Sequence, residues 1–268
     1  MVPNVLSIAG SDPSGGAGAQ ADLKTFAALR CHGMAAITAL TAQNTRGVRA
    51  VHTPPADFVA AQIDAIFDDI DVAAVKIGMV ATAEIAAAVA GRLAARKPGF
   101  VVLDPVLVAT SGDSLGGPGL VDALLRELTP LADLVTPNIP EAMRLTGMRA
   151  PRDDADLEAL ARALRALGAR AVLVKGGHLD GEMARDVLFD GGAARVYVAP
   201  RVATRNSHGT GCALSSAIAA FIARGLPLAA AVGAAKDYLT GALRASEELD
   251  VGHGHGPVNH FWNVWPPA

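Results

Sequence analysis

The sequence has few cysteines and little excess charge, and each shortage excludes a class of protein. Only two cysteines, Cys31 and Cys212, occur among the 268 residues, so no disulfide framework is expected and a reducing compartment fits. The formal net charge is −3, and no run of lysine and arginine marks a nucleic-acid surface. The expected partner is therefore a small-molecule substrate and not a nucleic acid.

Long apolar segments and aromatic residues are also scarce. Glycine, proline or a charge interrupts every apolar stretch well before the length of a membrane span, so no membrane partner is expected. Residues 1–4 lack the basic stretch and apolar core of a signal peptide, which predicts a cytoplasmic protein. Aromatic residues make up only 4%, but hydrophobic residues make up 51%, mostly Ala, Val and Leu. This composition supports a large aliphatic core.

A repeating pattern is present instead: a short apolar run, a turn rich in glycine or proline, then an amphipathic stretch. The apolar runs that predict buried strands are residues 5–9, 37–42, 72–77, 100–103, 134–136 and 171–174. The predicted helices are residues 20–29, 56–68, 82–96, 119–128, 141–146, 155–167, 211–224 and 227–245. Strands that are apolar on both faces and alternate with helices indicate a mainly parallel sheet covered on both sides.

One segment departs from this alternation. Residues 187–189 and 195–198 flank Asp190-Gly191-Gly192, which predicts a hairpin and places antiparallel strands at one edge of the sheet. No linker, internal repeat or charge block divides the chain. A single α/β domain over residues 1–268 is therefore expected.

The first glycine-rich segment, residues 10–18, joins a predicted strand to a predicted helix. Residues 16–21 within it match a loose dinucleotide-binding fingerprint, but the following strand ends without the carboxylate that would hold a ribose. A nicotinamide enzyme is therefore disfavoured. A tight turn alone needs fewer small residues, so this loop favours a close approach of the backbone to a ligand.

The second glycine-rich segment, residues 206–212, leads directly into a predicted helix. Its small residues leave backbone N–H groups free at the helix start, where an anion binds and where charge on a transferring phosphoryl group is stabilised. An ordinary helix start capped by Thr210 or Ser207 explains the segment equally well. Cys212 is open to two interpretations as well, a reactive thiol with a lowered pKa or a small buried hydrophobe.

Three further observations bear on other enzyme classes and on a metal site. Residues 112–116 match the nucleophile elbow of serine hydrolases without its strand–turn–helix context, so a hydrolase stays as the second enzyme hypothesis. His253, His255 and His260 fit no zinc spacing and are interpreted as tail histidines, some of them packed. Neither a Walker P-loop nor the protein-kinase signatures occur, so a phosphotransferase built on this chain needs another design.

Seven segments carry a family likeness when they are read in order: residues 8–24, 41–45, 76–79, 103–106, 136–142, 175–178 and 208–212. Together they resemble the hydroxymethylpyrimidine and phosphomethylpyrimidine kinases of thiamine biosynthesis. Residues 251–254 resemble the C-terminal end of that family too, which further weakens a metal interpretation of the histidines.

The resemblance implies a ribokinase-like fold, a three-layer α/β/α structure with a mostly parallel central sheet and antiparallel edge strands. It implies an enzyme that uses ATP and Mg²⁺ to phosphorylate 4-amino-5-hydroxymethyl-2-methylpyrimidine to its monophosphate and then to its diphosphate. A homodimer is expected. Pyridoxal kinases share the fold and several motifs, so a pyridoxal or pyridoxine kinase is one alternative. A non-catalytic pyrimidine-binding protein on the same fold is the other.

Residue roles are carried over from the matching motifs. The resemblance implies that Gln43 hydrogen-bonds the aminopyrimidine, because a side-chain amide donates and accepts at once. The residues that would complete this substrate pocket are Gly10, Ala17, Asp22, Met79 and Val106.

The resemblance places the phosphoryl group at the second glycine-rich segment. Gly209, Thr210, Gly211 and Cys212 would form an anion hole for it. Sugar kinases of the same superfamily have an aspartate base where this chain has Cys212. Cys212 is therefore expected to be the base, with a pKa lowered by the helix N-terminus, and a mere packing role is the alternative.

The nucleotide side of the site follows from the same likeness. Asp104 and Glu141 would organise Mg²⁺ and its waters, since this ion prefers oxygen ligands. For Glu141 the alternative is a carboxylate that only complements a helix dipole. Lys175 and Asn138 would contact ATP, although a lysine at the end of a strand could equally be solvated.

Two departures from the family pattern are visible. Ala213 and Ser216 stand where Thr and Ala are usual, and this change is expected to alter packing and not chemistry. Thr110 stands where a lysine is common, which puts a phosphate contact from that loop in doubt.

Overall fold

The computed structural model describes residues 1–107, 117–177, 179 and 181–265. Within these residues one sheet holds nine strands in the order β3-β2-β1-β4-β5-β6-β7-β8-β9. The parallel strands are β1 (Asn4–Ser11), β2 (His32–Asn44), β4 (Ala74–Ile77), β5 (Val101–Leu103), β6 (Leu134–Val135) and β7 (Val172–Lys175). The antiparallel strands are β3 (Gly47–His52), β8 (Met183–Phe189) and β9 (Arg195–Pro200).

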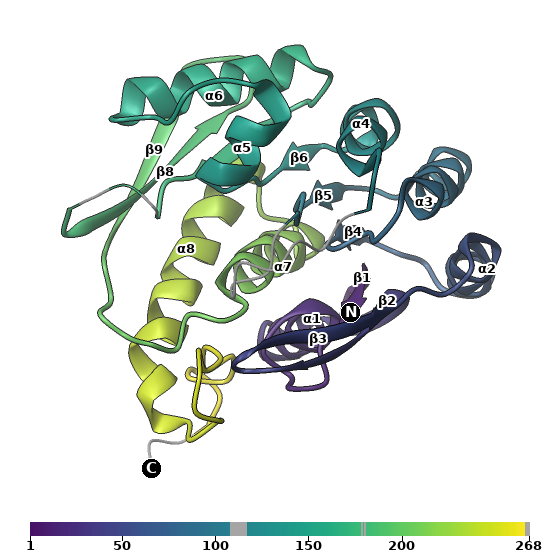
Figure 1. Cartoon of the computed structure of the whole chain (residues 1–268), viewed down its shortest axis with the longest axis horizontal. Coiled ribbons are helices and arrows are strands. Elements are labelled where there is room, and N and C mark those ends of the chain that lie inside the picture. Colours follow the sequence, from purple (N-terminus) through teal and green to yellow (C-terminus); the bar gives the residue numbers. More distant parts are fainter. Residues whose placement is uncertain (108–116, 178, 180, 266–268) are drawn as a thin grey trace.

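Helices cover both faces of this sheet, as Figure 1 shows. One face carries α2 (Ala56–Phe67), α3 (Ala83–Arg96), α4 (Leu120–Ala123), α5 (Ile139–Thr146) and α6 (Asp154–Ala166). The other face carries α1 (Gly18–Ala28), α7 (Thr210–Ala223) and α8 (Leu228–Arg244). The expected three-layer α/β/α architecture with a mostly parallel sheet is confirmed.

Alternation along the strands explains the two cores. In β1, Leu6 and Ile8 pack into the core beneath α2 to α6, whereas Val5 packs into the core beneath α1, α7 and α8. In β7, Leu173 likewise points to the second core while its two neighbours point to the first. Because successive side chains of a strand point to opposite faces, a strand buried on both sides must be apolar throughout.

The structure corrects two expectations about local structure. Antiparallel strands lie at both edges of the sheet and not at one, because β3 pairs with β2. The sequence pattern missed β3 because most of its residues are exposed and give no apolar run. The predicted helix 119–128 is short α4 followed by a π-helical segment (Leu124–Leu128) and a 3₁₀ turn (Thr129–Leu131). Pro130 has no N–H to continue an α-helical ladder there.

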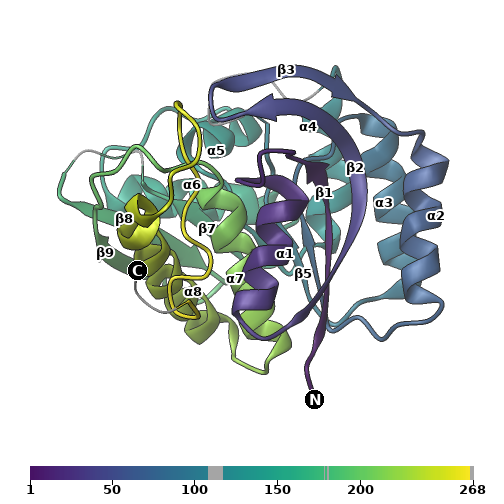
Figure 2. The same ribbon diagram turned by 90° about the horizontal axis from the view of Figure 1, so that it is seen from below.

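β2 is longer than its neighbour β1, and the difference builds an arm. Pairing of β1 with β2 ends at Ser11 and Leu40, and residues 41–44 pair only with β3. The β2–β3 pair therefore extends past the carboxyl end of β1, as the upper part of Figure 2 shows.

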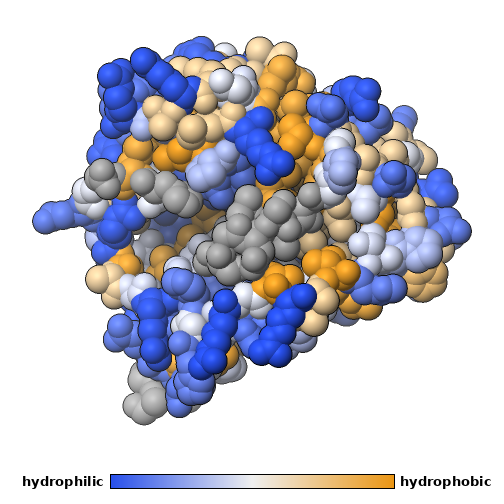
Figure 3. Space-filling model, viewed as in Figure 1, coloured by the Kyte–Doolittle hydropathy of each residue, from blue (hydrophilic) through white to orange (hydrophobic). Residues whose placement is uncertain are grey.

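The outer surface is mixed in character. On the face seen in Figure 3, hydrophilic side chains dominate the periphery and interrupt the hydrophobic ones. Within the described residues, no helix combines the length and the apolar character that a membrane crossing requires.

Candidate active site

The site residues gather where the parallel strands end. Gly10 lies near the end of β1, Met79 follows β4, Asp104 follows β5 and Lys175 ends β7. The carboxyl ends of parallel strands meet at one edge of a sheet, which is where open α/β folds bind ligands.

The two glycine-rich segments touch each other at this edge. Gly209 has a φ of 78°, and a Cβ added there would lie 1.8 Å from the carbonyl oxygen of Gly16. Only glycine combines a left-handed backbone with such a close approach. The first glycine loop is thereby packed directly against the start of α7.

Asp12 organises the first glycine loop. Its buried carboxylate accepts hydrogen bonds from the backbone N–H groups of Ser14, Gly16 and Ala17. It also lies 2.8 Å from Nε2 of His208, which belongs to the second segment. Burial alone would raise the pKa of Asp12, but the bonds from His208 and Ser14 hold that pKa below its usual value. Sequence reasoning assigned no role to Asp12 or His208, although both lie in the matching motifs.

Gln43 reaches this network from the β2–β3 arm. Its Nε2 lies 3.3 Å from Nε2 of His208, and Thr41 donates a hydrogen bond to its Oε1 over 3.2 Å. The predicted pyrimidine-binding amide is thus held next to the residue that precedes Gly209.

Three other residues of the predicted substrate pocket lie together. Met79 and Val106 pack with Ala39 in one small apolar cluster. A Cβ at Gly10 would lie 3.0 Å from Sδ of Met79, so glycine leaves room for that side chain. Ala17 lies apart from this cluster, against Gly209.

Asp22 is placed differently from the other predicted pocket residues. Its carboxylate is completely buried and pairs with Nζ of Lys76 at 2.9 Å. Hydroxyl groups of Ser7 and Ser216 donate to the same carboxylate over 2.6 and 2.7 Å. The Asp22 carboxylate thus joins α1 to β1, β4 and α7 beneath the site. Its direct contact with substrate stays a prediction.

Lys76 is a buried residue of this site that the sequence analysis did not single out. It interrupts an apolar strand run and is fully buried. Burial alone would lower the pKa of Lys76, but the charge of Asp22 holds that pKa above its usual value. A lysine inside an otherwise apolar strand was the available signal, because a buried cation needs a partner.

Ser216, one of the two departures from the family pattern, adds a buried hydrogen bond as well as altering packing. Its hydroxyl donates to Oδ1 of Asp22 over 2.7 Å. Ser216 lies four residues after Cys212, so both occupy the same face of α7. An alanine there has no group for this hydrogen bond. Ala213, the other departure, packs against Ala242 and Val258.

A second buried ion pair lies under the start of α7. Nζ of Lys175 is 2.7 Å from Oδ1 of Asp104, and Ser215 donates to Oδ2 over 3.1 Å. Burial would raise the pKa of Asp104, but Lys175 holds it below its usual value. A Cβ at Gly211 would lie 3.2 Å from Nζ of Lys175, so this lysine adjoins the predicted anion hole.

Glu141 and Asn138 form a capping box at the start of α5. The Glu141 carboxylate accepts from the Asn138 N–H over 2.8 Å, and the Asn138 side chain accepts from the Glu141 N–H over 2.8 Å. Glu141 therefore lies at a helix start, as its alternative interpretation requires. The predicted contacts of Glu141 with Mg²⁺ and of Asn138 with ATP stay predictions.

The surroundings of Glu141 disfavour its ionised form in the protein alone. Burial, assisted by the charge of Asp104 and opposed by Lys175, raises the pKa of Glu141 to about 7. In the part of the chain that the structure describes, no three His, Cys, Asp or Glu residues are grouped to hold a metal by themselves. Two acidic side chains fit Mg²⁺, which usually keeps several waters and takes other ligands from substrate phosphates.

The expected lowering of the Cys212 pKa is wrong for the protein alone. Burial raises the pKa of the Cys212 thiol to about 11, and the carboxylates of Asp22 and Asp104 add to the shift. Lys76 and the N–H of Gly18 act in the opposite direction without overcoming it. Desolvation is the largest of these effects, and the expected base role of Cys212 stays a prediction.

The remaining motif residues are those outside the described part of the chain and the three histidines near the C-terminus. The elbow motif at residues 112–116, Thr110 and His178 are outside the described residues. His260 is buried, whereas His253 and His255 are exposed.

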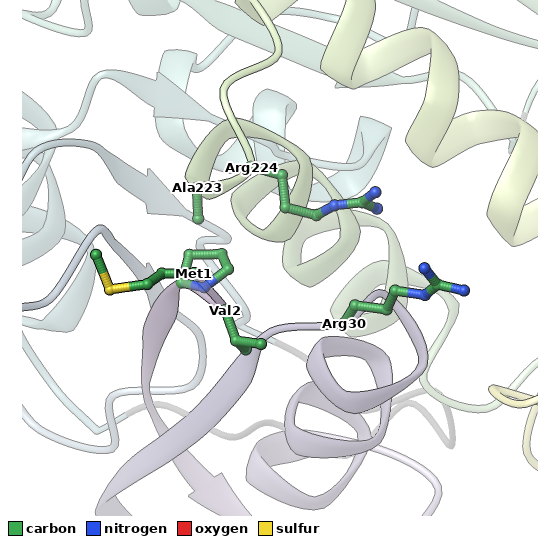
Figure 4. Close-up of a pocket in the computed structure, with 6 residues that line it drawn as sticks. Met1, Val2, Arg30, Ala223 and Arg224 are labelled. Carbon is green, nitrogen blue, oxygen red and sulfur yellow. The ribbon is translucent and has the colours of Figure 1, made fainter.

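A pocket at the opposite edge of the sheet is shown in Figure 4. It lies where the chain enters β1 and is lined by Met1, Val2, Pro3, Arg30, Ala223 and Arg224. The predicted site residues lie at the other ends of these elements, so this pocket is separate from the candidate active site.

The fold and this arrangement define the class. A three-layer α/β/α sheet with a glycine-rich helix start beside buried acid–lysine pairs is the scaffold of ribokinase-like small-molecule kinases. The family model described as phosphomethylpyrimidine kinase matches residues 12–259. The chain belongs to this family, which confirms the resemblance carried by the seven segments.

Known proteins are similar over nearly the whole chain. The hydroxymethylpyrimidine/phosphomethylpyrimidine kinase of Rhizobium meliloti (strain 1021) is 55% identical over 266 residues, which cover 99% of each protein. The crystal structure of phosphomethylpyrimidine kinase from Clostridium difficile 630 is 44% identical with a TM-score of 0.80, covering 90% of this chain and 99% of that one. An ADP complex of Bacillus subtilis pyridoxal kinase is 37% identical with a TM-score of 0.88, covering 97% and 98%.

Proposed function

We propose that this protein transfers phosphate from ATP to 4-amino-5-hydroxymethyl-2-methylpyrimidine, and then to the monophosphate so formed. The observation that carries the proposal is the direct link between Gln43 and the start of α7. Nε2 of Gln43 lies 3.3 Å from His208, whose chain neighbour Gly209 is the N-cap of α7. An amide for the ring and a helix start for phosphate are therefore side by side.

Gln43 is the group proposed to select the ring. An aminopyrimidine presents an amino donor next to a ring-nitrogen acceptor, and a side-chain amide complements both. Met79 and Val106 supply an apolar surface nearby. The hydroxymethyl group would then point towards the free N–H groups that open α7.

The start of α7 is proposed to hold the phosphoryl group during transfer. Phosphoryl transfer depends mainly on positioning and on stabilising charge at the transferred group. The N–H groups of Gly211 and Cys212 at the helix start and the ammonium of Lys175 both act in that sense, whereas the Thr210 N–H donates to the Ser207 carbonyl oxygen over 3.4 Å. Asp104 holds Lys175 at 2.7 Å and so keeps its charge at this place.

Mg²⁺ is proposed to bind with the nucleotide beside Asp104 and Glu141. When bound, the ion would neutralise phosphate charge. The protein's own contribution is two acidic groups, one of which has a pKa raised to about 7 by burial and the neighbouring carboxylate. A cation there would favour the ionised form of Glu141.

Cys212 is proposed as the acceptor of the alcohol proton. With a pKa raised to about 11, its thiol is protonated at neutral pH in the protein alone. The base role therefore requires that the pKa falls when substrates bind. If it does not fall, Cys212 acts as part of the anion hole through its backbone N–H.

A phosphotransfer assay tests the proposal. Purified protein with ATP and Mg²⁺ is given hydroxymethylpyrimidine, its monophosphate or pyridoxal, and the phosphorylated products are separated and identified. We expect the monophosphate and then the diphosphate of the pyrimidine. Gln43→Leu should weaken pyrimidine binding by about 1–3 kcal/mol, because hydrogen-bonding groups on the ring lose their partner. Formation of neither pyrimidine product would refute the proposal.

Pyridoxal phosphorylation is the second candidate, favoured by the likeness to the pyridoxal kinase structure of Bacillus subtilis. The same assay separates the two, since Gln43 should favour the aminopyrimidine. A higher kcat/KM for pyridoxal than for hydroxymethylpyrimidine would make this candidate the function. Absence of any product would instead revive a non-catalytic pyrimidine-binding protein.

We also propose that the protein is a single domain, is cytoplasmic and forms a homodimer. The continuous sheet supports a single domain, and the two free cysteines are compatible with a cytoplasmic protein. Support for a homodimer comes from the exposed side chains of Leu40 in β2 and of Val51 in the edge strand β3. Sedimentation at micromolar concentration should give twice the chain mass, and a monomer would contradict the homodimer.

A further inference from the structure

The glycine–histidine segment near the C-terminus lies against the arm that carries Gln43. Residues 252–256 read Gly-His-Gly-His-Gly, with glycine at every second position. Figures 1 and 2 both show the C-terminal segment beside the turn that joins β2 to β3. Neither a metal interpretation nor the proposed function accounts for these glycines.

The segment holds Thr45, the residue two positions after Gln43. The N–H of His255 donates to the Thr45 carbonyl oxygen over 2.9 Å, and the N–H of Gly254 donates to Oγ1 of Thr45 over 3.1 Å. A Cβ at Gly254 would lie 2.0 Å from that carbonyl oxygen, and a Cβ at Gly252 would lie 2.4 Å from Oγ1. Glycine therefore permits the backbone of the segment to lie directly on the turn.

The same segment also holds the residues that lead into α7. The N–H of His208 donates to the carbonyl oxygen of Gly256 over 3.0 Å, and His208 forms a parallel β-bridge with Pro257. A Cβ at Gly256 would lie 2.2 Å from Oδ1 of Asn206. The segment thus contacts His208 itself, and it reaches Gln43 through Thr45, two positions along the chain.

The far end of the segment is anchored in the body of the protein. Val258 is completely buried against Ala213 and Ala242. The N–H of Asn259 donates to the carbonyl oxygen of Ala242 over 3.0 Å, and the Tyr238 hydroxyl donates to the carbonyl oxygen of His260 over 2.6 Å. The contacts at Thr45 and His208 are therefore made by a backbone fixed to α8.

We propose that residues 252–257 form a clamp that sets the position of Gln43 relative to the start of α7, with Gly254 as its positioning residue. The inference rests on the proposed function, because it concerns the recognition of the pyrimidine. The clamp acts through Thr45 and His208 and does not itself touch substrate. Loosening it displaces the amide of Gln43 from the ring while the ATP side, at Lys175 and Asp104, stays in place.

Gly254→Ala is the variant that tests the clamp. The added methyl meets backbone atoms, namely the Thr45 carbonyl oxygen at 2.0 Å and the Arg46 nitrogen at 3.0 Å. Backbone atoms cannot rotate away from the added methyl group as a flexible side chain would, so the segment and the turn must separate. Gly91→Ala is the matched control, because its Cβ would meet nothing within 4 Å.

Steady-state kinetics and amide exchange are measured on both variants and the parent. In Gly254→Ala we expect KM for the pyrimidine to rise about tenfold, the equivalent of one hydrogen bond of ~1.4 kcal/mol. KM for ATP should change less than about twofold, and the His208 amide should exchange faster because it donates to Gly256. Gly91→Ala should match the parent in all three measurements.

Other results would overturn either the clamp or the proposed function. An unchanged KM for the pyrimidine in Gly254→Ala, or an equal rise in both KM values, would overturn the clamp while leaving the proposed function intact. A parent protein that does not phosphorylate the pyrimidine would overturn the proposed function itself. If Gly254→Ala does not fold, Thr45→Val serves instead, since it removes only the Oγ1 acceptor. Thr45→Val should raise KM for the pyrimidine about threefold, and no change there would refute the clamp.

Discussion

Removing the Ser216 hydroxyl should weaken both the stability and the turnover of this protein. Ser216→Ala deletes the 2.7 Å hydrogen bond to the buried Asp22 carboxylate. Hydrogen bonds to charged groups contribute about 1.5–3 kcal/mol to stability. Ser7 and Lys76 still bind Asp22 in the variant, so the lower part of this range, about 1.5–2 kcal/mol, is expected. For a chain of this size the melting temperature should fall by about 3–8 °C.

The effect on turnover has a separate origin. Ser216 ties α7 to Asp22 one turn after Cys212, so its loss lets the anion hole shift relative to the pocket. A displacement of 1 Å can cost about a hundredfold in rate, and a fraction of that displacement should lower kcat roughly 3–10-fold. Both KM values should change little, because charge stabilisation at α7 acts mainly in the transition state.

The control is another buried hydroxyl that lies away from the site. Thr129 donates to the Leu124 carbonyl oxygen over 2.9 Å, so Thr129→Val removes a bond between uncharged groups worth about 1 kcal/mol. Calorimetry and steady-state kinetics on both variants separate stability from turnover. The reasoning is refuted if Ser216→Ala keeps the parent kcat, or if Thr129→Val lowers kcat as much.

Three further predictions concern the ionisable side chains of Glu141 and Cys212. Because burial raises the pKa of Glu141 to about 7, the folded state binds an extra proton between about pH 4.5 and 7, and stability falls as pH rises through that window. Glu141→Gln, which can still cap α5, should remove this dependence, which amounts to about 3 kcal/mol in total. Unfolding is followed at several pH values without nucleotide, and equal slopes in parent and variant would contradict the prediction. Because burial raises the pKa of Cys212 to about 11, alkylation of this thiol should be slow at pH 7 and accelerate about tenfold per pH unit above it, and rapid labelling at pH 7 would show the reasoning to be wrong. Cys212→Ala should lower kcat by about 10²-fold or more if the thiol is the base, while pyrimidine binding measured by calorimetry stays intact.

Much of the architecture could be predicted because the apolar runs that mark the strands are patterns of neighbouring residues. Every apolar run named as a parallel strand overlaps one, since a strand buried on both faces must be apolar throughout. The exposed strand β3 gave no such signal, because an edge strand on a surface arm needs no continuous apolar run. The π-helical segment at Leu124–Leu128 was equally invisible, since its side chains follow a helical pattern.

The site was predicted unevenly for a similar reason. Gly209 and Gly211 stood out by composition at a helix start, and the structure places them against Gly16 and Lys175. The lowered pKa of Cys212 was inferred from the helix start alone. Desolvation, which depends on everything packed around the thiol, reversed its sign.

The sequence by itself determined the order of strands and helices, the family, and the residue types available for binding phosphate and a pyrimidine. These depend on periodicity, glycine spacing and motifs, all of which are properties of neighbouring positions. Only the tertiary structure decided that Ser216 supports Asp22, that Lys76 is a buried counter-charge, and that the C-terminal glycines lie on Thr45. Those contacts join residues tens to hundreds of positions apart. Burial, pairing and close backbone approach exist only once the chain has brought such distant segments together.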